Sequence, residues 1–195
     1  MKMILSSQVF NDLEATNKIH KLIDKKFDEL KVLLIATPCL PYGPEKYYEE
    51  LILNGFKEQN IIIFEHKKPQ EYKDLDIDLI YVTGGNTFTG LKLIKECNFD
   101  KEIKKYLDKG VTYIGRSAGA HIVTKNIEHI LNFDSNDVSL SDYDGLGLFD
   151  GILVCHYSVK RKELYEQLIK ENKYKVYSLT NQEILVIEDA AVNKY

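Results

Sequence analysis

Short runs of apolar residues alternate with longer amphipathic segments along the chain. Consecutive apolar and often β-branched residues predict buried strands at 2–7, 31–37, 60–66, 78–86, 111–115 and 152–158. Apolar residues at helical spacing predict helices at 17–30, 45–56, 87–98, 100–110 and 160–173. Strands that are apolar on both faces and alternate with helices are typical of a mostly parallel sheet covered by helices.

Two parts of the chain depart from this alternation. Residues 127–150 are rich in Asp, Ser and Gly and predict an irregular segment. Near the C-terminus, 175–180 and 183–189 predict an antiparallel pair of strands. The sequence shows no linker or internal repeat. We therefore expect one domain, residues 1–195, of α/β class, a three-layer sandwich with a mostly parallel sheet.

Composition and charge narrow the possible partners and compartment. The chain has 195 residues with a net charge of −4, and lysines are interspersed with acids, so we expect no nucleic-acid and no membrane partner. No apolar stretch approaches the roughly 20 residues of a membrane span, and the N-terminal apolar run is too short for a signal peptide. Cys39, Cys97 and Cys155 have no ligand-like spacing. These features predict a cytoplasmic protein with reduced cysteines and with no metal or organic cofactor.

A serine between two glycines follows one of the predicted strands. The pattern G-x-S-x-G occupies 115–119, after the apolar run 111–114 and before an apolar segment. One glycine would suffice for an ordinary strand-to-helix connection. Two of them indicate a turn too tight for larger side chains, which would hold the Ser117 hydroxyl out beyond the sheet. This arrangement is typical of a nucleophilic serine.

A serine nucleophile needs a base, and histidine is the usual one. Of the five histidines, His20 and His66 are predicted to lie at the surface, and His121 and His129 follow Ser117 closely in the chain. His156 ends an apolar strand at the edge where the carboxyl ends of parallel strands meet, where ligands bind in such sheets. His156 is therefore the favoured base.

A hydrolytic site also needs groups that bind the oxyanion and an acid that orients the histidine. The backbone amides of Gly84, Gly85 and Ala118 are candidates to bind an oxyanion, since they lie at the same edge. Spacing alone does not choose which acid would orient His156. The candidates in the irregular segment are Asp134, Asp137, Asp142, Asp144 and Asp150.

Three blocks of sequence resemble the peptidase E family. They are "YVTGGNTFTGLKLIKE" (81–96), "GVTYIGRSAGAHIV" (110–123) and "DYDGLGLFDGILVCHYS" (142–158). Members of this family are serine dipeptidases, and their fold is related to that of type 1 glutamine amidotransferases, which is flavodoxin-like. The resemblance therefore implies that fold and a serine-type peptidase activity.

The resemblance also implies roles for particular residues. Ser117 would be the nucleophile and His156 the base. Asp134 would be the acid of the triad, with Asp137 as the alternative. Gly85 and Ala118 would donate their amides to the oxyanion.

Two further residues would bind substrate, namely Asn86 and Arg161. Arg161 matches a basic residue that some relatives use to recognise an N-terminal aspartate. The chain departs from the family at Val154-Cys155, where Asn-Pro is usual, and at His121. Because these departures lie at the substrate edge, they affect the expected specificity more than the expected chemistry.

The sequence leaves three functions open. The first is a serine peptidase that hydrolyses dipeptides or other short peptides, with those that carry an N-terminal Asp as candidates, and that acts as a monomer or homodimer. The second is a serine hydrolase of the same fold that acts on another acyl or isopeptide substrate. The third is a catalytically silent amidotransferase-like binding module. A glutamine amidotransferase itself is disfavoured because its nucleophile is cysteine, whereas residue 117 is serine.

Overall fold

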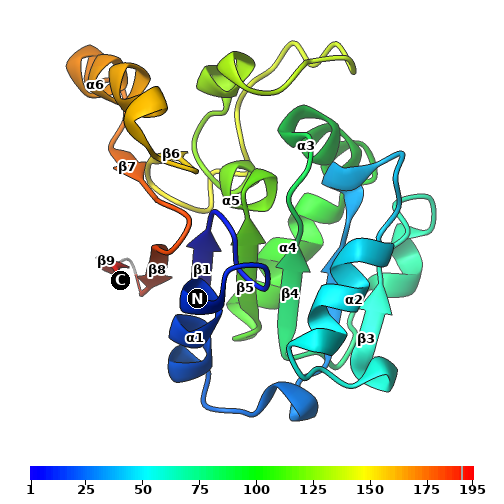
Figure 1. Ribbon diagram of the computed structural model, residues 1–195. Coiled ribbons are helices and arrows are strands. Elements are labelled where there is room, and N and C mark those ends of the chain that lie inside the picture. Colours follow the sequence, from blue (N-terminus) through cyan, green and yellow to red (C-terminus); the bar gives the residue numbers. More distant parts are fainter. Residues whose placement is uncertain (190) are drawn as a thin grey trace.

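The computed structural model describes residues 1–189 and 191–195, which build a seven-stranded sheet with order β3-β2-β4-β5-β1-β8-β9 (Figure 1). The first five strands in this order are parallel, whereas β8 runs antiparallel to β1 and β9 antiparallel to β8. The strands are β1 (Lys2–Ser6), β2 (Val32–Ile35), β3 (Ile61–Ile63), β4 (Leu79–Val82), β5 (Thr112–Arg116), β8 (Ile184–Glu188) and β9 (Ala191–Lys194). Two more strands, β6 (Ile152–Val154) and β7 (Val176–Ser178), form a separate parallel pair.

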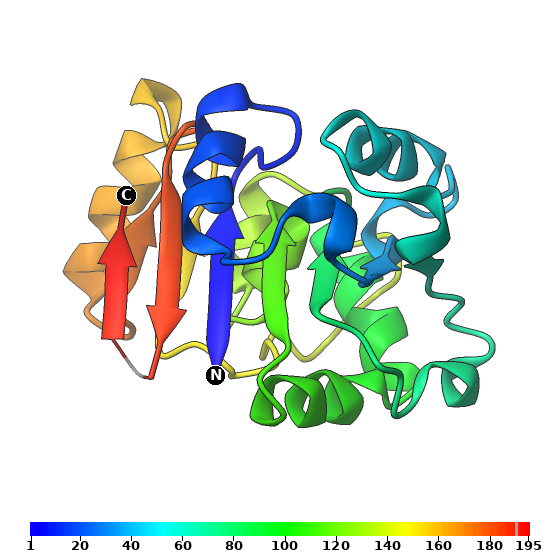
Figure 2. The ribbon, with the colours of Figure 1, turned by 90° about the horizontal axis from the view of Figure 1, so that it is seen from below.

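Helices cover both faces of the large sheet (Figure 2). One face is covered by α1 (Leu13–Leu22) and α2 (Glu45–Leu53), and the other by α3 (Thr87–Glu96), α4 (Phe99–Asp108) and α5 (Ala118–Ile122). The last helix, α6 (Lys162–Glu171), lies beside β7 (Figure 1). The predicted three-layer α/β class with a mostly parallel sheet is confirmed.

Consecutive strand residues point into opposite hydrophobic cores. In β1, Met3 and Leu5 pack with the α3–α5 side, and Ile4 packs with the α1–α2 side. In β2, Leu33 and Leu34 divide in the same way. Side chains alternate across a strand, so a sheet covered on both faces requires continuous apolar runs. This explains why the strands are visible in the sequence.

The first helix lies earlier in the chain than predicted. Instead of 17–30, α1 spans Leu13–Leu22, and Asp12 caps its N-terminus by accepting a hydrogen bond from the amide of Ala15. The helix ends before Ile23, and only a short 3₁₀ turn forms at Phe27–Glu29. Phe27 is still buried on the α1–α2 side, so its apolar character reflects packing and not continued helix.

The predicted antiparallel pair of 175–180 with 183–189 is wrong. β7 pairs with β6 in parallel, while β8 joins the large sheet between β1 and β9. The apolar residues of β8 are buried against the core, which a hairpin with the half-buried β7 would not achieve. The connection between β7 and β8 therefore passes from one sheet to the other, next to the carboxyl end of β1.

Three observations concern membrane-spanning helices, the cysteines and metal binding. None of the helices in 1–189 and 191–195 is long and apolar enough to cross a membrane. Cys39, Cys97 and Cys155 are free thiols, and Cys155 is buried. Within the same residues, no cluster of three or more His, Cys, Asp or Glu side chains could hold a metal ion.

Candidate active site

Ser117 occupies a strained turn between β5 and α5. Its φ and ψ are 48° and −105°, a conformation rare for a residue with a side chain. Both flanking glycines are required by close packing. A Cβ on Gly115 would lie 2.6 Å from the Gly119 carbonyl oxygen, and one on Gly119 would lie 2.2 Å from that of Val82. The two glycines thus allow the tight turn that the sequence predicts.

The Ser117 hydroxyl contacts a histidine from the other sheet. Ser117 Oγ lies 2.9 Å from Nε2 of His156, which follows β6. His156 has a positive φ of 53°. Its amide donates to Ser7 Oγ at 2.9 Å, and the Ser7 hydroxyl in turn donates to the Leu179 carbonyl. The backbone of the base is therefore anchored to the end of β1, beside the nucleophile.

Asn181, which we did not anticipate, stands at the far side of the histidine ring. Its Oδ1 lies 2.8 Å from Nδ1 of His156. With Nδ1–H donating to this oxygen, Nε2 presents a lone pair to the Ser117 hydroxyl. Asn181 comes from the connection between β7 and β8 that crosses to the large sheet. The side chains thus form a Ser-His-Asn arrangement, in which asparagine takes the third place as it does in papain-like cysteine proteases.

The two aspartates predicted as the triad acid have other partners. Asp134 Oδ2 accepts a hydrogen bond of 2.8 Å from the amide of Thr87, the first residue of α3. A carboxylate is stabilised there because helix amides and the helix dipole converge on it. Asp137 is exposed and accepts from the Ser135 hydroxyl. The assignment of Asp134 as the acid bonded to His156 is thus corrected: Asn181 holds that place.

Several neighbours act on the protonation of His156. Burial lowers its pKa, the hydrogen bond that Nδ1–H donates to Asn181 raises it, Arg161 and Arg116 lower it, and the charge of Asp134 raises it. The net shift is downward from the ordinary value. His156 is therefore neutral at pH 7 and able to accept a proton. Asp134 acts on the base through its charge, without a hydrogen bond to it.

Two backbone amides next to Ser117 are free to bind an oxyanion. Within residues 1–189 and 191–195, the N–H groups of Gly85 and Ala118 have no protein acceptor. Gly85 has a φ of 135°, and a Cβ there would lie 2.1 Å from the Pro38 carbonyl oxygen, so only glycine fits. Unpaired amides beside a nucleophile match the requirement of an oxyanion hole.

Asn86 caps α3. Its Oδ1 accepts from the Thr89 amide at 2.9 Å, and its Nδ2 donates to the Ser135 carbonyl at 2.7 Å. Both ends of the side chain are thus bonded within the protein. Asn86 shapes the turn that carries Gly85.

Arg161 lies on the His156 side of the site. It donates through Nη1 to the Cys155 carbonyl at 2.7 Å, and its guanidinium carbon is 3.7 Å from the centre of the Phe133 ring. In the described part of the chain it forms no ion pair within 4.0 Å. A half-buried cation with no carboxylate in direct contact is a candidate receptor for a substrate carboxylate.

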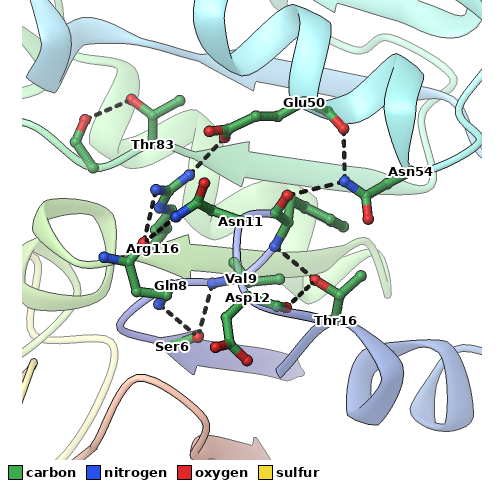
Figure 3. Close-up of polar contacts among 12 residues, drawn as sticks. Ser6, Gln8, Val9, Asn11, Asp12, Thr16, Glu50, Asn54, Thr83 and Arg116 are labelled. Carbon is green, nitrogen blue, oxygen red and sulfur yellow. Dashed lines mark hydrogen bonds and ion pairs between the residues drawn. The ribbon is translucent and has the colours of Figure 1, made fainter. Parts of the chain in front are cut away.

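A buried polar network supports the strand that ends in Ser117. Arg116, the preceding residue, donates to Glu50 at 2.6 Å and to Gln8 at 2.9 Å (Figure 3). Its guanidinium carbon also lies 5.2 Å from the centre of the Tyr47 ring. These bonds connect β5, the end of β1 and α2, and they fix the position from which the serine turn starts.

The other histidines near the nucleophile in sequence do not contact it. His121 is buried on α5, and its ring stands edge-on to that of His129 with 6.0 Å between centres. Burial holds the pKa of His121 well below its ordinary value, so it is neutral. His129 bonds through Nε2 to the Leu153 carbonyl. Both are packing residues in this arrangement.

The fold and this edge together define an α/β protein with a serine nucleophile turn and a histidine partner. The chain matches the model of peptidase family S51 over residues 3–195. It is 39% identical over 120 residues to an uncharacterized peptidase of Listeria monocytogenes, covering 59% of this chain and 58% of that protein. It is 25% identical over 144 residues to peptidase E of Haemophilus influenzae, covering 71% and 64%. These sequence matches therefore span less than two thirds of each relative's own length.

A solved structure extends the match to the whole fold. The crystal structure of a candidate peptidase E from Listeria monocytogenes superposes with a TM-score of 0.80 at 27% identity, covering 100% of this chain and 97% of that one. A peptidase from an acI-B1 Actinobacterium, at 14% identity and a TM-score of 0.71, shares the fold. The chain belongs to peptidase family S51, and the resemblance to peptidase E that the sequence shows is confirmed.

Proposed function

We propose that this protein is a serine peptidase that hydrolyses dipeptides or other short peptides through an acyl-enzyme on Ser117. One observation carries the proposal: Ser117 Oγ lies 2.9 Å from a neutral His156, on a strained turn that also presents two free amides. Membership of a family of serine-type peptidases supports it. A binding module would have no need to hold a serine in this costly conformation.

The geometry supports a two-step acyl transfer. As Ser117 Oγ attacks the scissile carbonyl carbon, Nε2 of His156 takes the hydroxyl proton, and the amides of Gly85 and Ala118 stabilise the oxyanion. The imidazolium then gives its proton to the leaving amine, the C–N bond breaks and an ester remains on Ser117. His156 next takes a proton from a water molecule that attacks the ester. The acid leaves and Ser117 regains its proton.

Asn181 has the role of the third member in this proposal. By accepting from Nδ1–H it holds His156 in the tautomer and orientation that the reaction needs. It carries no charge, so the imidazolium is stabilised less than by a carboxylate. Asp134 supplies part of that stabilisation at longer range, as its effect on the His156 pKa indicates.

Arg161 supports a substrate with a carboxylate near the scissile bond. That carboxylate could be the side chain of an N-terminal aspartate, as the family resemblance implies, or the C-terminal carboxylate of the leaving residue. A small peptide substrate fits a cytoplasmic location, which we include in the proposal, and the three free thiols are consistent with it.

A dipeptide panel with matched variants tests the proposal. Asp-Leu, Leu-Leu and their C-terminal amides would be incubated with the wild type, Ser117→Ala and His156→Ala, and the products quantified by mass spectrometry. We expect hydrolysis by the wild type alone. Arg161→Met should raise KM for every substrate whose carboxylate it binds, which identifies that carboxylate. If the wild type cleaves no peptide although an organophosphonate labels Ser117, a different acyl substrate is indicated. If Ser117 is not labelled either, the protein is a binding module.

A further inference from the structure

A cavity of about 510 Å³ opens next to the proposed oxyanion hole. We call it the Tyr47 pocket. Its lining includes Pro38, Leu40, Tyr42, Tyr47, Gly85 and Asn86. Gly85 is shared with the oxyanion hole, so the pocket begins where the substrate carbonyl would lie. Its volume is in the range of pockets that hold small ligands.

The sheet order shows which half of a substrate would reach this pocket. The segment that forms most of its wall follows β2, which neighbours β4, whereas His156 is anchored beside β1 on the other side of β5. The leaving nitrogen must lie close to His156, because His156 protonates it. Groups that extend past Gly85, away from His156, therefore belong to the acyl residue.

One polar group of the pocket, the Tyr47 hydroxyl, lies close to the nucleophile. A Cβ placed on Gly84 would lie 3.2 Å from this hydroxyl oxygen and 3.6 Å from Cβ of Ser117. The hydroxyl and the nucleophile thus flank the same glycine. Tyr47 is buried, and the Arg116 guanidinium packs against its ring. This packing holds the ring in place, and the Arg116 guanidinium donates its hydrogen bonds to Glu50 and Gln8 and not to the Tyr47 hydroxyl.

The walls of the pocket favour a large uncharged side chain. Most of the lining is apolar, and it includes two tyrosines, Tyr42 and Tyr47. The charged residues at the rim are one acid and one base, Glu45 and Lys46, both exposed. Their charges offset each other, so the pocket offers no net attraction to an acidic side chain. A tyrosine or phenylalanine side chain would bury apolar surface against the rings.

We propose that the Tyr47 pocket is the subsite for the side chain of the acyl residue and that it selects large apolar or aromatic side chains. The Tyr47 hydroxyl oxygen accepts a hydrogen bond from the α-ammonium group of the acyl residue. Arg161, on the opposite side, binds the C-terminal carboxylate of the leaving residue. This inference rests on the proposed function, and it assigns the substrate as a dipeptide with a bulky uncharged N-terminal residue.

Phosphonates test the acyl side without a leaving residue. Diphenyl α-aminoalkylphosphonates bearing benzyl, methyl or carboxymethyl side chains would be compared by the rate of Ser117 labelling, followed by mass spectrometry. We expect the benzyl compound to react at least tenfold faster than the other two. Equal rates, or fastest labelling by the carboxymethyl compound, would overturn the inference and leave the peptidase proposal standing. No labelling of Ser117 by any compound would remove the proposed function itself.

Variants then connect the selectivity to this pocket. Tyr42 is 90% exposed, so Tyr42→Ala should fold normally while removing one wall, and it should lower the benzyl-to-methyl rate ratio severalfold. Tyr195→Ala, which removes an exposed tyrosine from the chain end, is the matched control and should leave the ratio unchanged. Tyr47→Phe should slow labelling by all three compounds by up to about tenfold, the usual value of one hydrogen bond. If Tyr42→Ala leaves the benzyl-to-methyl rate ratio unchanged and Tyr47→Phe leaves the rate of Ser117 labelling unchanged, the Tyr47 pocket does not bind the side chain of the acyl residue.

Discussion

Replacing Asn181 by alanine removes the hydrogen-bond partner that the structure gives to Nδ1 of His156. A hydrogen bond to a group that becomes charged is worth about 1.5–3 kcal/mol. Asn181 is exposed, so water can take over part of its role, and the lower end of this range applies. We expect kcat/KM to fall about 10- to 30-fold, far less than the roughly 10⁴-fold loss known for a buried triad aspartate.

Asn181→Asp keeps the contact with His156 and adds a negative charge to it. A carboxylate beside His156 favours the imidazolium, and at an exposed position its attraction is on the order of 1 kcal/mol. The His156 pKa should therefore rise. Since the base must be neutral, the acid limb of the kcat/KM profile should move to higher pH while the plateau is kept.

The assay is steady-state hydrolysis of the best dipeptide from pH 4.5 to 9, with Gln182→Ala as a control in the same loop. Asn181→Ala should lower the plateau, and Gln182→Ala should leave it unchanged. If Asn181→Ala retains the wild-type plateau and Asn181→Asp the wild-type acid limb, Asn181 does not orient the base. The Ser-His-Asn assignment would then be wrong.

Other residues of the site give further predictions. The acid limb of the wild-type kcat/KM profile should have its midpoint below pH 6.5. Arg161→Met should raise this midpoint, because the Arg161 cation lowers the pKa of His156. An unchanged midpoint would contradict the proximity of Arg161 to His156. Asp134→Asn should lower the same midpoint and also reduce the free energy of unfolding by about 0.3–1 kcal/mol through the lost contact at α3, measured by urea denaturation. Gly85→Ala should cost at least about 10²-fold in kcat, since a Cβ would collide with the Pro38 carbonyl and displace an oxyanion donor. Wild-type kcat in that variant would remove Gly85 from the oxyanion hole.

Much of this arrangement can be predicted from the chain because it depends on local signals. The strands are continuous apolar runs since both faces of the sheet are covered. The Ser117 turn is marked by its two glycines, each of which is required by a close backbone approach. The position of His156 follows from the end of one strand. Such features need only neighbouring residues to be recognised.

Asn181 could not be predicted in the same way because its place depends on long-range topology. The residues after β7 suggest an ordinary turn of a hairpin, yet β7 and β8 belong to different sheets. Only that crossing brings Asn181 to His156. The aspartate-rich segment misled for a related reason, because Asp134 is bound at the start of α3, a helix 47 residues earlier in the chain. A polar loop between two strands of different sheets is the signal to look for.

The most direct test of the account is mass spectrometry of the intact protein after reaction with an organophosphonate, on the wild type and on Ser117→Ala. We expect one covalent adduct, located on Ser117 and absent from the variant. We also expect the rate of labelling to fall as pH falls through the pKa of His156. A wild-type protein that stays unmodified at pH 7 to 8, where His156 is neutral, would contradict the activated serine on which the proposed peptidase activity depends.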